Sequence, residues 1–333
     1  MSWETIYNRI EDEFGEDAVR NAPMSERINF RVGGPADILV RPRHIARLQR
    51  LMRLISGTDV PTFIFSGGSN LIVRDGGIRG VVIDVSQGFD EMSFTRMPDG
   101  TTHLFIGAGR TVADMVDACA ERGLAGVEWG AGIPGTVGGG IKGNAGTRDG
   151  DFAGSLRSVQ MVEFDGHLSD YERRDLVFRY RGLVKIGRFI IVSGVLVLRD
   201  GDKAAIRKSI DDMIAWRYER QPYEMASAGS IFKNPPEAPA GRLIDQAGLK
   251  GTRVGGAMVS DVHTNFIVNE KEATARDILE LIEIVKAKVK EVHGVDLLQE
   301  VIVVGEDDRT PQKVSAGHML QRNDAEERND DVD

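Results

Sequence analysis

The most informative segment of the chain reads Gly130-Ala131-Gly132-Ile133-Pro134-Gly135-Thr136-Val137-Gly138-Gly139-Gly140-Ile141-Lys142-Gly143-Asn144-Ala145-Gly146. Glycine supplies 8 of these 17 residues, against 39 of 333 in the whole chain. Fixing so many glycines costs conformational entropy, and flexible linkers are seldom this apolar. We therefore expect a ligand, or very closely packed main chain, to lie directly against this backbone.

A second glycine loop, Ser66-Gly67-Gly68-Ser69-Asn70, follows a predicted strand at residues 62–65 and precedes an apolar run at 71–73. Two adjacent glycines let successive amide groups converge on an anion, and Ser69 and Asn70 add side-chain donors. A pyrophosphate would suit this loop, although the loop alone is equally compatible with a hairpin turn. The glycine density of residues 130–146 favours the ligand-binding interpretation.

Two common nucleotide motifs do not fit these loops. Gly130, Gly132 and Gly135 match G-x-G-x-x-G, but the dinucleotide fingerprint requires a helix to begin within the motif. Further glycines follow instead, so we expect no helix there and disfavour a conventional Rossmann site. Because Gly143 follows Lys142, the chain also lacks the P-loop string, which excludes a P-loop nucleotidase.

Composition and charge limit the function classes. With 41% apolar and 28% charged residues, the 333-residue chain is expected to form two or three globular units. The net charge of −9 argues against a nucleic-acid partner. Residues 306–333 hold nine acidic and four basic residues, contributing 4 − 9 = −5, and we expect a disordered acidic tail there.

The sequence shows little sign of a metal site, a disulfide bond or a membrane-spanning segment. Cys119 is the single cysteine, falls on an apolar helix face and is predicted to fill the core. The six histidines show no metal-ligand spacing, so no metal is expected. With neither a secretory signal nor an apolar run of membrane-spanning length, we predict a cytoplasmic protein, and we expect a monomer.

Apolar periodicity divides the chain into an N-terminal helix at residues 1–22, a first domain at 23–220 and a second at 221–305. We expect the folded body to begin near Asn29 and the first domain to comprise subdomains at about 23–86 and 87–220. It begins with a β-α-β unit over residues 36–65, and a second such pattern follows the strand at 104–106. Its later elements are predicted at residues 112–119 (helix), 159–164 and 189–198 (strands) and 204–217 (helix).

The second domain is predicted to be α+β. Its helix at residues 276–293 has an apolar stripe and should stop at Gly294, a common helix-ending residue. The stripe consists of Ile278, Leu281, Ile282, Val285, Val289 and Val292. A shorter helix is expected at residues 242–247, and strands at 266–268 and 301–304.

Several ordered motifs resemble the FAD-binding signatures of UDP-N-acetylenolpyruvoylglucosamine reductases. The resemblance spans residues 29 to about 305 and rests on Asn29-Phe30-Arg31-Val32-Gly33-Gly34-Pro35-Ala36, Gly67-Gly68-Ser69-Asn70-Leu71, Ile133-Pro134-Gly135-Thr136-Val137-Gly138-Gly139 and Asn144-Ala145-Gly146. It implies an α+β protein with a vanillyl-alcohol-oxidase-like (PCMH-type) two-part FAD-binding domain and a smaller α+β substrate domain. The implied FAD contacts are Gly67, Gly68, Ser69, Asn70, Leu71, Gly132, Ile133, Pro134, Gly135, Val137, Gly138, Gly139, Asn144, Ala145 and Gly146.

The resemblance also implies a reaction. In such enzymes NADPH reduces FAD, and hydride then passes from flavin N5 to UDP-N-acetylglucosamine enolpyruvate, giving UDP-N-acetylmuramate for peptidoglycan. Ser230 matches the family's proton donor, Glu300 its essential carboxylate and Arg181 the arginine that polarises the substrate carboxylate. On their own these residues would be interpreted as a turn-capping serine, a strand-end charge and half of a surface pair.

Substrate contacts are implied at Tyr180, Arg220, Lys233, Asn234, His263 and Asn265, and Asn265 matches the branch of the family that lacks an extra tyrosine-bearing loop. Two segments depart from the family pattern, Gly182-Leu183-Val184 after Arg181 and Thr147-Arg148-Asp149 after the second glycine loop. Two alternatives stay open. One is a flavin-dependent oxidase of a hydroxy acid or sugar in the same fold, and the other is a non-catalytic nucleotide-binding protein.

Overall fold

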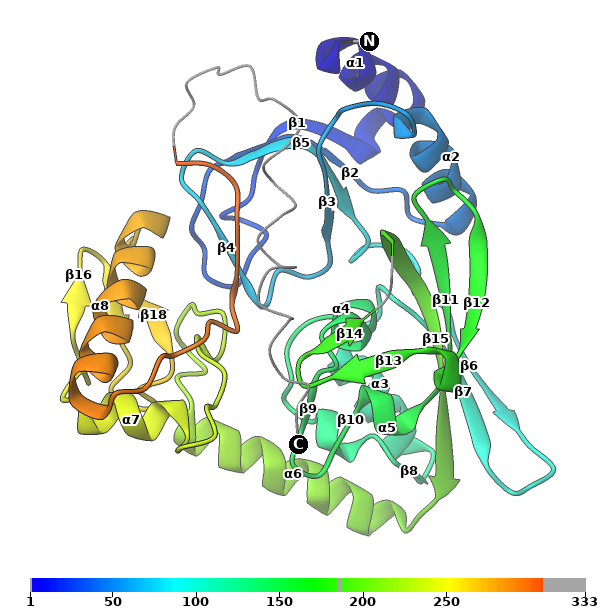
Figure 1. The fold of residues 1–333 in the computed structure, drawn as a ribbon. Coiled ribbons are helices and arrows are strands. Elements are labelled where there is room, and N and C mark those ends of the chain that lie inside the picture. Colours follow the sequence, from blue (N-terminus) through cyan, green and yellow to red (C-terminus); the bar gives the residue numbers. More distant parts are fainter. Residues whose placement is uncertain (1, 185–186, 308–333) are drawn as a thin grey trace, which may run out of the picture.

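The structure is a computed structural model that describes residues 2–184 and 187–307. Figure 1 shows two sheets beside each other and a third lobe. Helix α6 (Lys203–Arg220) runs along the bottom of this view and leads from the second sheet to the third lobe. Most of the predicted acidic tail at 306–333 lies outside the described residues, so that expectation is not tested. None of the helices in the described part of the chain is long and apolar enough to cross a membrane.

The first sheet has the order β1-β2-β5-β3. Its strands are β1 (Ala18–Pro23), β2 (Pro35–Val40), β3 (Thr62–Phe65) and β5 (Ile78–Asp84). Strands β2 and β3 both pair in parallel with β5, and α2 (Ile45–Ile55) connects them. The first predicted β-α-β unit is therefore confirmed, with β5 between its two strands.

The N-terminal helix is shorter than predicted. Helix α1 spans Trp3–Phe14, because Gly15 leaves the helical conformation with a φ of 55°. After a single 3-10 turn η1 (Gly15–Asp17), β1 pairs antiparallel with β2. The prediction of one helix over residues 1–22 was thus wrong, as was a folded body beginning near Asn29. Ile6, Ile10 and Phe14 of α1 are buried in the core.

The second sheet is antiparallel, with the order β12-β11-β15-β7-β6 and β8 paired to β15. Its strands are β6 (Met92–Arg96), β7 (Thr102–Gly107), β8 (Leu124–Ala125), β11 (Leu156–Glu163), β12 (Leu168–Glu172) and β15 (Phe189–Asp200). Helix α3 (Val112–Glu121) follows β7, but no parallel strand follows it, so a second β-α-β unit was wrong. Cys119 on α3 is 1% exposed, and burial raises its pKa to about 12, which confirms a core role.

The second glycine segment does form a helix, contrary to the prediction. Helix α4 (Val137–Lys142) follows the 3-10 turn η2 (Glu128–Gly130), and the Thr136 side chain caps its first turn. A Cβ atom at Gly138 would lie 2.7 Å from Ala108 Cβ, and one at Gly140 would lie 2.3 Å from Phe152 Cε2. These glycines therefore serve close packing of α4. The remaining small elements are α5 (Phe152–Ser155), η3 (Arg173–Asp175) and the hairpins β9–β10 (Gly146–Thr147, Gly150–Asp151) and β13–β14 (Val177–Arg179, Gly182–Val184).

The third lobe packs one helix, α8, against a small antiparallel sheet and a second helix, α7, against α8, as predicted for an α+β unit. It contains α7 (Ala240–Gln246), β16 (Arg253–Val254), β17 (Ala257–Val259), β18 (Ile267–Asn269) and α8 (Ala275–His293). A capping box between Thr274 and Asp277 starts α8, and Gly294 ends it with a φ of 72°. Val292 is 46% exposed, so its place in the predicted apolar stripe was wrong.

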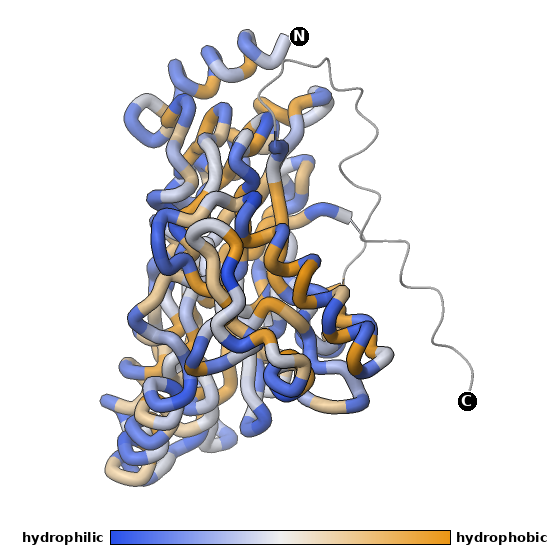
Figure 2. The backbone as a smooth tube through the Cα atoms, turned by 90° about the vertical axis from the view of Figure 1, so that its left-hand side faces the viewer, coloured by the Kyte–Doolittle hydropathy of each residue, from blue (hydrophilic) through white to orange (hydrophobic). Residues whose placement is uncertain are grey.

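The last strand joins the first half of the chain instead of the third lobe. Strand β19 (Ile302–Val304) pairs in parallel with β4 (Leu71–Val73), and Figure 1 shows the orange segment returning to β4. Buried residues from 22–82 and from 228–301 form one hydrophobic core. Figure 2 shows hydrophobic segments gathered inside the body and hydrophilic ones along its edges. The predicted boundary near residue 221 therefore separates segments that share a core.

Candidate active site

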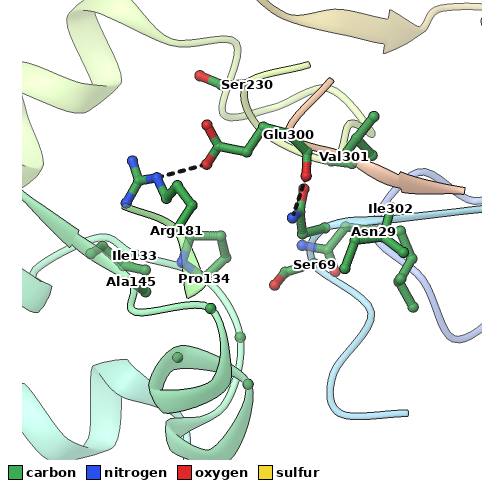
Figure 3. A pocket seen from close by; sticks show the side chains of 18 of the residues that line it. Asn29, Ser69, Ile133, Pro134, Ala145, Arg181, Ser230, Glu300, Val301 and Ile302 are labelled. Carbon is green, nitrogen blue, oxygen red and sulfur yellow. Dashed lines mark hydrogen bonds and ion pairs between the residues drawn. The ribbon is translucent and has the colours of Figure 1, made fainter. Parts of the chain in front are cut away.

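A large cavity lies where the two glycine loops, the β13–β14 hairpin, α6 and the segments 221–234 and 298–304 meet. Its volume is about 3690 Å³, large enough for a dinucleotide-sized cofactor together with a second ligand. Figure 3 shows part of its lining, where side chains from distant segments face one another.

The loop at residues 66–70 is not a hairpin turn. Strand β3 before it pairs with β5, and β4 after it pairs with β19, so the two flanking strands do not pair with each other. Gly67 and Gly68 have φ values of 74° and 61°, and a Cβ atom at Gly68 would lie 2.7 Å from the Arg27 carbonyl oxygen. Within residues 2–184 and 187–307, no protein group accepts a hydrogen bond from the main-chain N–H groups of residues 67–70. Such amides suit a phosphate.

The two glycine loops form one continuous cradle. The Ser66 and Thr136 hydroxyl groups are hydrogen-bonded with their oxygens 2.5 Å apart. A Cβ atom at Gly135 would lie 2.6 Å from Ser69 Oγ, so a side chain there would push the loops apart. Main chain without side chains thus lines this part of the cavity, and it fits the diphosphate of FAD.

Most of the predicted FAD contacts line the cavity. They are Gly68, Ser69, Asn70, Leu71, Ile133, Pro134, Gly135, Gly138, Gly139, Ala145 and Gly146. Four others support the wall from behind. Gly67 packs against Thr136, the Gly132 carbonyl accepts a hydrogen bond from Tyr223, Val137 is fully buried, and the Asn144 amide group donates to Asp151.

Arg181 and Glu300 form an ion pair at the cavity wall, with Nε and Oε1 2.8 Å apart. Arg181 occupies the turn of the β13–β14 hairpin with a φ of 60°, and its Nη1 donates to the Gly146 carbonyl at 3.2 Å. The departing sequence Gly182-Leu183-Val184 is strand β14, so it holds this turn in place. Backbone strain of this kind persists where the surrounding structure enforces it.

Main-chain contacts bring Glu300 next to Ser230. The Glu300 amide donates to the Ile231 carbonyl at 2.8 Å, and the Asn70 side chain donates to the Glu300 carbonyl at 3.1 Å. Figure 3 shows the Ser230 hydroxyl and the Glu300 carboxylate on the same side of the cavity, across from Pro134. Burial raises the pKa of Glu300 above its ordinary value, although Arg181 and Lys233 oppose this shift. The carboxyl group is therefore held closer to its neutral form.

Three of the six predicted substrate residues reach the cavity, namely Tyr180, Lys233 and Asn234. Arg220, His263 and Asn265 are not among its lining residues, and their contact with substrate stays a prediction. The Asn265 side chain is 4% exposed, accepts a hydrogen bond from the Phe232 amide and donates to the Phe232 carbonyl. His263 packs edge-on against Phe266 and accepts a hydrogen bond from the Asn265 amide.

Lys142, Arg217 and Tyr223 are among the residues of the cavity wall that sequence reasoning missed. Lys142 donates to the Leu183 carbonyl at 3.2 Å and lies over the Phe189 ring, and burial lowers its pKa. It lies inside the second glycine loop, which was the available signal. Arg217 belongs to a predicted helix whose apolar periodicity is weak, so no sequence pattern indicated that it lines the cavity.

The departing segment Thr147-Arg148-Asp149 also lines the cavity, at the turn between β9 and β10. The Arg148 side chain is 93% exposed, so this segment places a solvated positive charge at the edge of the cavity. No cluster of three or more His, Cys, Asp or Glu side chains that could hold a metal ion occurs in the described part of the chain.

Two family models match the chain. Residues 36–171 match an FAD-binding domain, and residues 221–304 match the C-terminal domain of UDP-N-acetylenolpyruvoylglucosamine reductase. The first match covers both glycine loops, and the second covers Ser230 and Glu300. The two matches therefore assign the cradle and the facing segment to the two parts of one kind of enzyme.

Individual proteins give the same result. The chain is 40% identical to the UDP-N-acetylenolpyruvoylglucosamine reductase of Syntrophomonas wolfei over 91% of its own length and all of the relative's. It is 39% identical to that of Clostridioides difficile over 88% of its length and 95% of the relative's. The crystal structure of the Thermus caldophilus reductase superposes with a TM-score of 0.73 at 35% identity, covering 86% of this chain and 97% of the other. The chain belongs to the UDP-N-acetylenolpyruvoylglucosamine reductase family of FAD-dependent oxidoreductases.

Proposed function

We propose that the chain reduces UDP-N-acetylglucosamine enolpyruvate to UDP-N-acetylmuramate with NADPH as the reductant. The observation that carries this proposal is the Arg181–Glu300 ion pair, which stands beside Ser230 and directly above the glycine cradle. Family membership supports the reaction class, and the cradle supports FAD as the resident cofactor. When bound there, FAD supplies hydride transfer.

Each of the three side chains has a role that follows from its chemistry. Arg181 offers a forked guanidinium that suits the planar carboxylate of an enolpyruvyl group, and it would orient that group. Ser230 would give its hydroxyl proton to the substrate carbon next to the carboxylate. Glu300, whose pKa burial raises, would in its protonated form donate a hydrogen bond to the oxygen where negative charge develops.

The test is Ser230→Ala, with Ser227→Ala as the matched control. Both serines line the cavity, three residues apart, but only Ser230 is proposed to move a proton. Ser230→Ala should keep its FAD, and NADPH should still bleach the absorbance of that FAD, while turnover falls by about a hundredfold or more. Ser227→Ala should keep turnover within a small factor of the wild type.

Two results would contradict the proposal. Unchanged turnover in Ser230→Ala would remove Ser230 from the reaction. Oxygen consumption with a hydroxy acid or sugar, without NADPH oxidation stimulated by the enolpyruvyl sugar nucleotide, would favour the oxidase instead. Stopped-flow absorbance of the bound FAD, followed first with NADPH and then with substrate, separates these outcomes.

A further inference from the structure

The β13–β14 hairpin, which presents Arg181 at its turn, is held on both strands by side chains of the second glycine segment. Lys142 ends α4, and its Nζ donates to the Leu183 carbonyl at 3.2 Å. The Asn144 side chain donates to the Arg179 carbonyl at 3.5 Å. Arg179 and Leu183 lie two residues before and two residues after Arg181. The two hydrogen bonds therefore hold the strands on either side of the turn.

Apolar packing fixes the base of this hairpin but not its tip. The Leu183 side chain is buried in the core, and its cross-strand neighbour Phe178 packs against the same core. The Arg173 guanidinium lies over the Phe178 ring, 4.8 Å from its centroid. At the tip, by contrast, Tyr180 is 59% exposed. The direction in which the turn points therefore depends on its polar contacts.

Lys142 is the stronger of the two side-chain donors. Its hydrogen bond is shorter than that of Asn144, and a charged donor bonds about twice as strongly as a neutral one. Its Nζ also lies 4.8 Å from the centroid of the Phe189 ring. No carboxylate of residues 2–184 and 187–307 forms an ion pair with Lys142, so no competing partner draws the ammonium group away from the hairpin.

We propose that Lys142 is a positioning residue, which aims Arg181 at the substrate by holding strand β14. The inference rests on the proposed function, in which Arg181 orients the carboxylate of the enolpyruvyl group. Arg181 has a φ of 60°, which is unfavourable for a residue with a side chain, so the turn keeps this conformation only while its neighbours enforce it. Figure 3 shows the Arg181 guanidinium reaching the Glu300 carboxylate, and a rotation of the hairpin would separate the two.

The same contacts place Arg181 relative to the glycine cradle. Lys142 belongs to α4, and Arg181 Nη1 donates to the Gly146 carbonyl at 3.2 Å, so the hairpin is attached to the segment that is predicted to hold FAD. Misplacing a substrate-orienting group by about 1 Å can cost about a hundredfold in rate. A single hydrogen bond that sets the direction of the hairpin can therefore have a measurable effect on turnover.

The first measurement is hydrogen exchange of the main-chain amides of residues 177–184, followed by mass spectrometry on the FAD-loaded protein. Lys142→Met keeps a long side chain against Phe189 but cannot donate a hydrogen bond, whereas Lys142→Arg keeps a charged donor. Exchange should be about fivefold or more faster in Lys142→Met and close to the wild type in Lys142→Arg. Lys286→Met is the control and should leave exchange unchanged, because Lys286 pairs with Glu283 on α8 and does not line the cavity.

The second measurement is a double-mutant cycle with Arg181. Lys142→Met should lower kcat by about fivefold to tenfold, with a smaller change in the KM for the enolpyruvyl sugar nucleotide, and Lys142→Arg should recover most of the loss. Because Lys142 is proposed to act through Arg181, adding Lys142→Met to Arg181→Met should cause no further loss. A residue that merely stabilised the fold would lower turnover in both backgrounds.

Three results would overturn the proposal. Unchanged exchange of residues 177–184 in Lys142→Met would show that the hairpin does not depend on Lys142, and equal losses of turnover in both backgrounds would show that Lys142 does not act through Arg181. Lys142 also lines the cavity, so loss of FAD, or slower reduction of FAD by NADPH, in Lys142→Met would assign Lys142 to the cofactor instead. If the wild type does not turn over the enolpyruvyl sugar nucleotide, the proposed function fails, and faster exchange in Lys142→Met still supports the hold of Lys142 on the hairpin.

Discussion

The glycine cradle and the group of Arg181, Ser230 and Glu300 face the same cavity but are built differently. The cradle presents main chain from two short loops, each of which is complete within a single motif. The group of Arg181, Ser230 and Glu300 presents side chains. They come from a hairpin turn, a loop and the segment just before β19, which are far apart in the sequence. We infer that cofactor retention and proton transfer are separable, even though the Asn70 side chain and the Gly146 carbonyl connect the two regions.

The largest effect should come from Glu300→Gln. The amide keeps the size of the side chain but cannot act as an acid, so stabilisation of the developing charge is lost. Turnover should fall by about a hundredfold to a thousandfold, measured as NADPH oxidation with saturating substrate. Bound FAD should remain at the wild-type level. Loss of FAD in this variant would show that the two regions are not separable.

The converse change is Gly68→Ala, which alters only the cradle. Gly68 has a φ of 61°, and a Cβ atom there would lie 2.7 Å from the Arg27 carbonyl oxygen, so the loop must shift. We expect a loss of about 3 kcal/mol or more in unfolding free energy, together with weaker FAD retention. Gly100→Ala is the control, because its φ of 84° is also strained but nothing lies near its Cβ. Equal losses in both variants would contradict a role for the close approach.

A smaller effect is expected for Asn265→Ala, which tests a residue placed behind the wall. Its side chain satisfies both the amide and the carbonyl of Phe232, and both would be left unpaired in a buried site. Unfolding free energy should fall by about 1–3 kcal/mol, measured by urea denaturation, while the KM for the sugar nucleotide stays unchanged. Lys233→Met, at the cavity wall, should show the reverse pattern. A KM for the sugar nucleotide that rises in Asn265→Ala but not in Lys233→Met would support substrate contact by Asn265.

The smallest effect concerns pH. Burial raises the folded-state pKa of Glu300 above its ordinary value of 4.5. Its favourable contribution is therefore complete below that value and is lost as the pH rises through the folded-state pKa. Unfolding measurements across this window should show wild type losing stability relative to Glu300→Gln. Glu270, whose pKa is lowered by Arg253, should give a trend of the opposite sign in Glu270→Gln.

Local pattern predicted the elements far better than their partners. The apolar stripe of α8 and the stop at Gly294 follow from spacing along one helix, and the structure has both apart from the exposed Val292. The extent of α1 was misjudged because pairing with β2 converts residues 18–23 into a strand. Pairing of β19 with β4 depends on contacts between distant segments, which no local pattern reports.

The same distinction between local pattern and distant contacts applies to the residues of the site. Glycine spacing indicated the cradle directly, but only the family resemblance pointed to Arg181, Ser230 and Glu300, whose types are common on any surface. Arg217 lines the cavity, but the weak apolar periodicity of α6 could not indicate which of its residues do so. Asn265 is polar and near the site, yet its hydrogen bonds are directed at Phe232, which only coordinates can reveal.

The pairing of β4 with β19 has a consequence for synthesis on the ribosome. A nascent chain emerges from its N-terminus, so both glycine loops are made long before residues 302–304. Until those residues appear, β4 has no neighbouring strand and Asn70 lacks its contacts with the Glu300 carbonyl and the Ile302 amide. The wall of the pocket beside β4 is consequently complete only after almost the whole folded chain has been synthesised.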